Sequence, residues 1–152
     1  MLTAASGLDD TKFLRFSYVA ARILASYMTA SGKNILIADD DPAILESMQM
    51  MLELEGYGVV TTFNGNAIYQ LKEEFPDLLL LDIWMSGEDG REICKYLKQN
   101  EPTKHIPIVM ISASRDVKQS AKEAGADDFL AKPFEMNDLL AIVEKYVNAR
   151  KL

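Results

Sequence analysis

The chain has 152 residues, of which 49% are hydrophobic and 26% charged, a balance typical of one globular domain rather than of a disordered or fibrous chain. Its formal net charge of −7 argues against non-specific nucleic-acid binding, which needs a basic surface, and is compatible with an acidic metal-binding pocket or a basic partner. The single cysteine, Cys94, excludes an internal disulfide and a zinc site built from cysteines alone.

The first 32 residues form an N-terminal extension. Within it, apolar side chains recur every three or four positions over residues 12–28, which predicts an amphipathic helix capped by Asp9 or Asp10. The spacing is typical of a coiled-coil seam and favours dimerisation or partner docking. A leader that packs opportunistically and a basic helix at a membrane surface are the alternatives. The extension lacks the order of a signal peptide, and no stretch of 18 apolar residues in the chain is free of charge. We therefore expect a cytoplasmic protein without a membrane span.

From Asn34 onward, five short apolar runs alternate with five segments of helical spacing. The runs are residues 34–38, 58–63, 77–81, 107–112 and 128–131. The first helical segment opens at Asp41-Pro42, a cap followed by a proline at the first helical position, and stops at Gly56. The others are residues 64–75, 89–99, 114–124 and a last one after Pro133.

These elements predict the fold class of residues 33–150. The apolar runs are continuous rather than alternating, which indicates a parallel sheet covered on both faces by helices. Right-handed crossovers between the strands then produce a doubly wound α/β fold.

Polar and charged residues follow four of the five predicted strands. Ligands of a doubly wound sheet bind outside the carboxyl ends of its strands, so these residues are expected to meet at one edge. They are Asp39, Asp40 and Asp41 after the first strand, Asp82 after the third, Ser112 at the end of the fourth, and Lys132 after the fifth.

The residue types in this set point to phosphoryl chemistry. Clustered carboxylates repel one another and favour a hard divalent cation such as Mg²⁺, which takes oxygen ligands and is often shared with a phosphate. Lys132 supplies a point charge for a phosphoryl oxygen, and Ser112 can donate a hydrogen bond to another. Asp82 could then act as a nucleophile that forms an aspartyl phosphate.

Four stretches, "ILIADDDP", "LLLLDIWMSGEDG", "VMISAS" and "GADDFLAKPF", resemble the signature regions of response-regulator receiver domains from two-component signalling. The resemblance covers residues 33–148. It implies a flavodoxin-like sheet in the order 2-1-3-4-5, with the strands numbered along the chain, and it implies that Asp82 accepts a phosphoryl group from a histidine kinase or phosphotransfer protein. The resemblance also implies that Mg²⁺ is bound by Asp40, Asp82 and the backbone carbonyl of Trp84, with Asp39 acting through water. It further implies that Ser112 is the switch hydroxyl, Phe129 the switch aromatic residue and Lys132 the phosphate-binding lysine. Mn²⁺ is expected to substitute for Mg²⁺.

The chain departs from the family pattern at Ser86, where the family commonly has proline, and carries serine rather than threonine at position 112.

About 20 residues follow Lys132, so we expect no C-terminal output domain and no direct nucleic-acid contact. Output would pass through an unknown partner protein at the face made by the fourth helix, the fifth strand and the fifth helix. A homodimer could form through this face or through the N-terminal helix.

Two other functions fit parts of the sequence. The Asp39-x-Asp41 pair resembles the motif of haloacid dehalogenase-like phosphatases, but Pro42 starts a helix directly after it, no acidic pair follows Lys132, and Asp82 is left unexplained. A degenerate receiver that acts only as an interaction module is the second alternative, and the intact set of acids argues against it. We therefore expect a phospho-acceptor without turnover on an external substrate.

Overall fold

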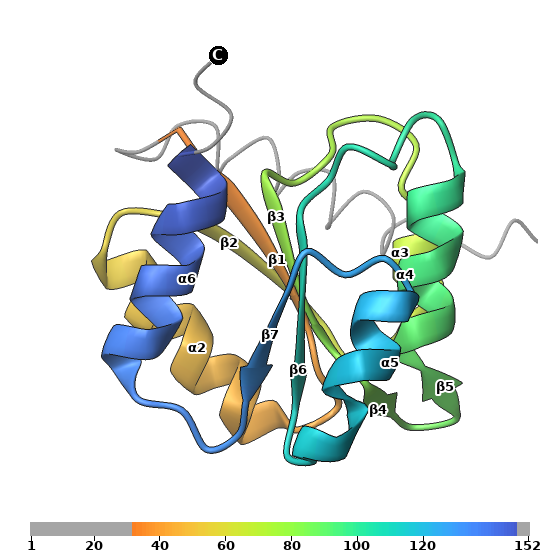
Figure 1. Ribbon diagram of the computed structural model, residues 1–152. Coiled ribbons are helices and arrows are strands. Elements are labelled where there is room, and N and C mark those ends of the chain that lie inside the picture. The colour runs from red at the N-terminus through yellow and green to blue at the C-terminus, as the bar shows by residue number, and fades with distance from the viewer. Residues whose placement is uncertain (1–31, 149–152) are drawn as a thin grey trace, which may run out of the picture.

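The computed structural model describes residues 32–148, in which a twisted sheet lies between two layers of helices (Figure 1). The helix predicted at residues 12–28 lies outside the described residues. In the described part of the chain, no helix combines the length and the apolar character that crossing a membrane requires.

The leucines at positions 78–81 show how the sequence builds the centre of the sheet. Each is fully buried. Leu79 and Leu81 belong to the core on one face of the sheet, and Leu78 and Leu80 to the core on the other, because successive side chains of a strand point to opposite faces. A strand buried on both faces therefore needs an unbroken apolar run, as the sequence predicted.

The five predicted strands are all present and form one parallel sheet. In chain order they are β1 (Asn34–Ala38), β2 (Gly58–Thr62), β3 (Leu78–Asp82), β6 (Ile108–Ser112) and β7 (Asp128–Ala131). They pair in parallel in the order β2-β1-β3-β6-β7. This confirms the predicted order 2-1-3-4-5 of a doubly wound, flavodoxin-like fold.

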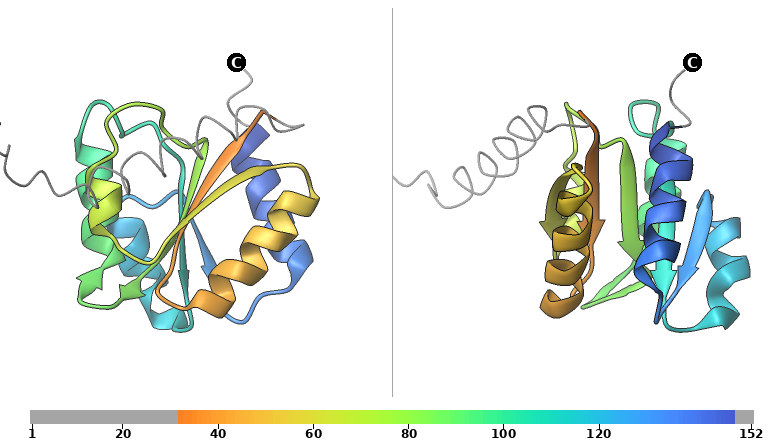
Figure 2. Two further views of the ribbon diagram at one scale, coloured as in Figure 1. Left: turned by 180° about the vertical axis from the view of Figure 1, so that it is seen from behind. Right: turned by 90° about the vertical axis from the view of Figure 1, so that its left-hand side faces the viewer.

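Within residues 32–148, five helices cover the sheet. They are α2 (Pro42–Leu54), α3 (Asn66–Tyr69), α4 (Gly90–Gln99), α5 (Lys118–Glu123) and α6 (Met136–Asn148), and a 3₁₀ turn, η1 (Arg115–Val117), leads into α5. Helices α2 and α6 cover one face of the sheet, and α3, α4 and α5 cover the other (Figures 1 and 2).

Two aspartates start the helices that flank the acidic edge. The Asp41 carboxylate accepts hydrogen bonds from the backbone N–H groups of Ala43 (2.9 Å) and Ile44 (3.4 Å), and Pro42 occupies the first position of α2. Asp89 caps α4 in the same way through the N–H of Arg91 (2.9 Å). Both are ordinary N-caps.

The helix predicted at residues 64–75 is wrong in length, because α3 spans only Asn66–Tyr69. Glu74 has a positive φ of 50°, which ends any helix before it, and Pro76 disfavours helical geometry at Phe75. Leu71 and Phe75 still pack against the core, but from irregular chain.

A two-stranded hairpin was not predicted. Strands β4 (Trp84–Met85) and β5 (Glu88–Asp89) pair antiparallel directly after β3. Two residues are too few to show a periodicity in the sequence.

Gly90, the first residue of α4, offers a test of how tightly the chain after this hairpin packs on β3. A Cβ atom at position 90 would overlap the backbone carbonyl of Asp82, which cannot move aside as a side chain could. We expect Gly90→Ala to lower the free energy of unfolding by about 3 kcal/mol in urea titrations. Gly87→Ala is the matched control: it has open space but a φ of 77°, and should cost about 1 kcal/mol. Equal effects of the two substitutions would contradict this packing.

Candidate functional site

The carboxyl ends of the strands meet at the lower edge of the molecule in Figure 1. Asp39 and Asp40 follow β1, and Asp82 is the last residue of β3. Carboxylate oxygens from these three residues lie within 4.8 Å of one another. Asp39 and Asp82 are only 2% and 6% exposed, so two charges are held out of water, which is costly unless opposite charge meets them.

Lys132 meets both buried carboxylates. Its ammonium group lies 2.7 Å from Asp39 Oδ2 and 3.4 Å from Asp82 Oδ1. The backbone places it there: Lys132 follows β7, and its N–H donates to the carbonyl of Ser112 at the end of β6 (2.8 Å). The structure thus brings together four residues that the sequence placed at this edge.

The electrostatics of the site are those of an excess of negative charge. Burial, followed by the charge of Asp39, raises the pKa of Asp82 from 3.8 to about 6, while Lys132 works in the opposite direction. Burial alone would lower the pKa of Lys132, but its hydrogen bond to Asp39 and the charge of Asp82 outweigh this effect, and its pKa is raised. Lys132 stays charged and Asp82 is mostly ionised at pH 7.

Three carboxylates and one ammonium group leave an unbalanced charge that a divalent cation would neutralise. The donor set, oxygens only and already close together, fits a hard cation such as Mg²⁺. The predicted contributions of Asp39 through water and of the Trp84 carbonyl stay predictions.

The two residues predicted to act as a switch lie on the neighbouring strands. Asp82 pairs in register with Ile111, which places Ser112 one residue further along at the same edge. Ser112 is buried, and its Oγ accepts a hydrogen bond from the N–H of Ser114 (3.2 Å). Phe129, on β7, is half-buried and packs against the core under α3, α4 and α5. Their role as a switch stays a prediction.

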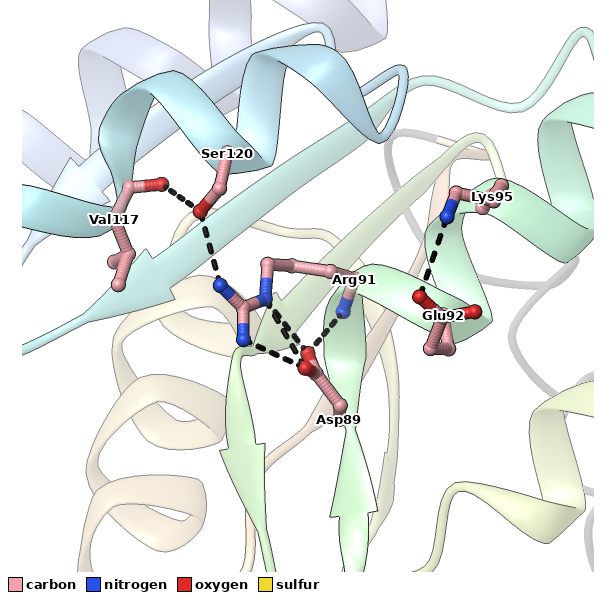
Figure 3. Close-up of polar contacts among 6 residues, drawn as sticks. All are labelled: Asp89, Arg91, Glu92, Lys95, Val117 and Ser120. Atoms are coloured by element: carbon pink, nitrogen blue, oxygen red, sulfur yellow. Dashed lines mark hydrogen bonds and ion pairs between the residues drawn. The ribbon is translucent and has the colours of Figure 1, made fainter.

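Arg91 joins the hairpin to helix α5, a contact that the sequence did not indicate. Its guanidinium binds the Asp89 carboxylate through Nη2 (2.7 Å) and Nε (3.0 and 3.1 Å), and Nη1 donates to Ser120 Oγ (3.1 Å) (Figure 3). The hydroxyl of Ser120 in turn donates to the carbonyl of Val117 (2.9 Å). The guanidinium also lies 4.7 Å from the ring centroid of Trp84, a cation–π contact. The indole, which is 54% exposed, therefore has the Arg91 guanidinium over its ring.

A second unforeseen contact links the hairpin to the acids. The hydroxyl of Ser86 donates a hydrogen bond to Asp40 Oδ2 (2.9 Å). The only signal in the sequence was that Ser86 replaces the proline common in the family that the chain resembles.

Comparisons with known proteins point to one family. Residues 35–144 match the model of the response regulator receiver domain. The chain is 38% identical over 112 residues to the DNA-binding dual master transcriptional regulator RpaA of Synechocystis, an alignment that covers 72% of this chain and 46% of that protein. The chain thus spans about half the length of that curated relative.

Solved structures agree. A response regulator from Chloroflexus aurantiacus is 35% identical, with a TM-score of 0.72 over 76% of this chain and 98% of that one. The receiver domain of the sensor histidine kinase PA1611 of Pseudomonas aeruginosa, which has magnesium coordinated in its active-site cleft, is 25% identical, with a TM-score of 0.70 over 76% of this chain and 98% of that one.

The raised pKa of Asp82 predicts that its ionisation lowers the free energy of unfolding of the metal-free protein. A carboxyl whose pKa rises from 3.8 unfolded to about 6 folded favours folding below pH 4, and this contribution is lost as the pH rises through 6. In EDTA at pH 7.5, Asp82→Asn should therefore raise the free energy of unfolding by about 1–3 kcal/mol. This increase in the free energy of unfolding should become smaller as the pH is lowered toward 4.

Urea titrations across this pH range measure the effect. Asp116→Asn, at an exposed aspartate of η1, is the control and should not raise the free energy of unfolding at pH 7.5. A variant Asp82→Asn that is less stable than wild type at pH 7.5 would contradict the charge balance described for the site.

Proposed function

We propose that this chain, which belongs to the response regulator receiver domain family, is a phospho-acceptor switch that carries a phosphoryl group on Asp82. We take residues 33–150 as the unit that does this. The observation that carries the proposal is the ammonium group of Lys132 between the buried carboxylates of Asp39 and Asp82 at the carboxyl edge of the sheet.

The chemistry assigned to Asp82 is nucleophilic attack. An oxygen of its ionised carboxylate attacks the phosphorus of a phosphohistidine donor, so an O–P bond forms as the P–N bond breaks and the imidazole leaves. Phosphoryl transfer needs mainly positioning and charge neutralisation. Mg²⁺, held by Asp40, Asp82 and the carbonyl of Trp84, with Asp39 acting through water, would supply neutralisation when bound. The ammonium group of Lys132, which lies 3.4 Å from Asp82 Oδ1, can turn to a phosphoryl oxygen.

The response to phosphorylation would pass through Ser112. Its hydroxyl can donate to a phosphoryl oxygen, since in its hydrogen bond with the Ser114 N–H it is the acceptor. A shift of Ser112 would move the chain that leads into η1 and α5, and Phe129 would turn inward behind it. This is a shift between two populated states of one fold.

Partners follow from this assignment. A histidine kinase or phosphotransfer protein would donate the phosphoryl group, and an unknown output protein would read the face of α5, β7 and α6. The same face, or the N-terminal extension, would serve in a homodimer. We propose no direct nucleic-acid contact, in keeping with the net charge of −7, although the relative RpaA is by its name a DNA-binding regulator.

Three finer assignments complete the proposal. Mn²⁺ would replace Mg²⁺, since both accept oxygen ligands. The location would be cytoplasmic. The chain would have no turnover on an external substrate.

The phosphatase alternative has no support, because Asp41 uses its carboxylate to cap α2.

Binding of beryllofluoride, a phosphoryl mimic, tests the function. Trp84 is the only tryptophan of the chain and lies two residues beyond Asp82, so its fluorescence should change saturably when Mg²⁺ and the mimic are both present. Asp82→Asn should abolish the change. Asp41→Asn is the matched control, since asparagine also caps helices well, and it should respond as wild type. No binding by fluorescence or by calorimetry would identify a degenerate receiver instead.

A further inference from the structure

The three acids of the site are held in different ways. Asp39 and Asp82 are buried and share the ammonium group of Lys132. Asp40 is the most exposed of the three, and within residues 32–148 the Ser86 hydroxyl is the one hydrogen-bond donor to its carboxylate, at 2.9 Å from Oδ2. The orientation of Asp40 therefore depends on a residue 46 positions away in the chain.

Ser86 lies in the turn of the β4–β5 hairpin. Met85 pairs with Glu88, so Ser86 and Gly87 are the two residues of the loop. Gly87 has a φ of 77°, and Ser86 is not among the residues with positive φ. This combination is typical of a type II turn, in which proline is favoured at the position that Ser86 occupies.

The turn therefore does not explain the serine. Its backbone would accept proline, which is also the residue that the resemblance to the family leads us to expect. What serine adds is a hydroxyl, and the structure uses that hydroxyl on Asp40.

We propose that Ser86 is a positioning residue of the metal site. Its hydroxyl holds one oxygen of Asp40, so the carboxylate keeps the orientation in which the three acids lie within 4.8 Å of one another. Hydrogen bonds that orient a ligand from outside the coordination sphere commonly strengthen metal binding. The inference rests on the proposed function, because the cation is the one that the phospho-acceptor site would hold.

The effect should be smaller than the loss of a ligand. Without the hydroxyl, an exposed Asp40 side chain samples other rotamers, and ordering it lowers the affinity for the cation. We expect Ser86→Ala to raise the dissociation constant for Mg²⁺ about tenfold.

Mg²⁺ titrations without a phosphoryl donor or mimic test this directly, followed by Trp84 fluorescence and by calorimetry. Ser86→Thr keeps the hydroxyl and should bind nearly as wild type. Ser86→Pro keeps the turn but lacks the hydroxyl, and should bind as weakly as Ser86→Ala. Ser47→Ala, which removes a serine hydroxyl bonded to the carbonyl of Ala43 on α2, is the matched control and should leave Mg²⁺ binding unchanged.

Asp40→Asn separates the inference from the function on which it rests. If Asp40→Asn weakens Mg²⁺ binding strongly while Ser86→Ala binds as tightly as wild type or more tightly, the role of Ser86 is overturned and the metal site stands. Failure of Ser86→Thr to restore binding also overturns that role. If neither wild type nor Asp40→Asn responds to Mg²⁺, the inference and the proposed function fall together. Equal thermal midpoints for the Ser86 variants would show that the changes in affinity do not come from unfolding.

Discussion

Three carboxylates lie at the end of one parallel sheet with the ammonium group of Lys132 between two of them, and the remaining excess of negative charge governs the site. A parallel sheet brings the ends of β1, β3, β6 and β7 to one edge, so residues far apart in the chain share one small volume. Burial disfavours the ionised form of Asp82, and the charge of Asp39 adds to this effect, which is why the pKa of Asp82 rises to about 6. The same excess favours a divalent cation at this edge.

The segment after β3 turns this edge into a defined site. Gly90 lets the start of α4 pass against the carbonyl of Asp82, and the hairpin carries Ser86 to Asp40. Arg91 then ties the hairpin to Ser120 on α5, the helix that follows the chain leading from Ser112. The segment that follows Asp82 is thus connected to α5 through hydrogen-bonded groups. Such connections allow a local change of charge to alter a distant surface.

The sequence predicted the elements whose signals are local. Strand β3 was recognised because a strand buried on both faces must be apolar throughout, and α2 because Asp41 and Pro42 mark its start. The acids, Ser112 and Lys132 were located because they end strands of a sheet whose topology was predicted. The length of α3 was overestimated, since its apolar spacing continues into irregular chain that also packs on the core. The contacts of Ser86 and Arg91 were out of reach, because each depends on how segments distant in sequence meet.

The proposed role of Asp82 as the acceptor of a phosphoryl group can be tested chemically. The most direct measurement is mass spectrometry of the full chain after incubation with Mg²⁺ and a small acyl phosphate donor, followed by borohydride reduction and peptide mapping. Reduction converts an aspartyl phosphate into homoserine and so marks the residue that carried the group. We expect one added phosphoryl group that requires Mg²⁺, with homoserine at position 82. Asp82→Asn should show neither the added group nor the homoserine. No added phosphoryl group, or a mark at another residue such as Asp39 or Asp41, would contradict this role.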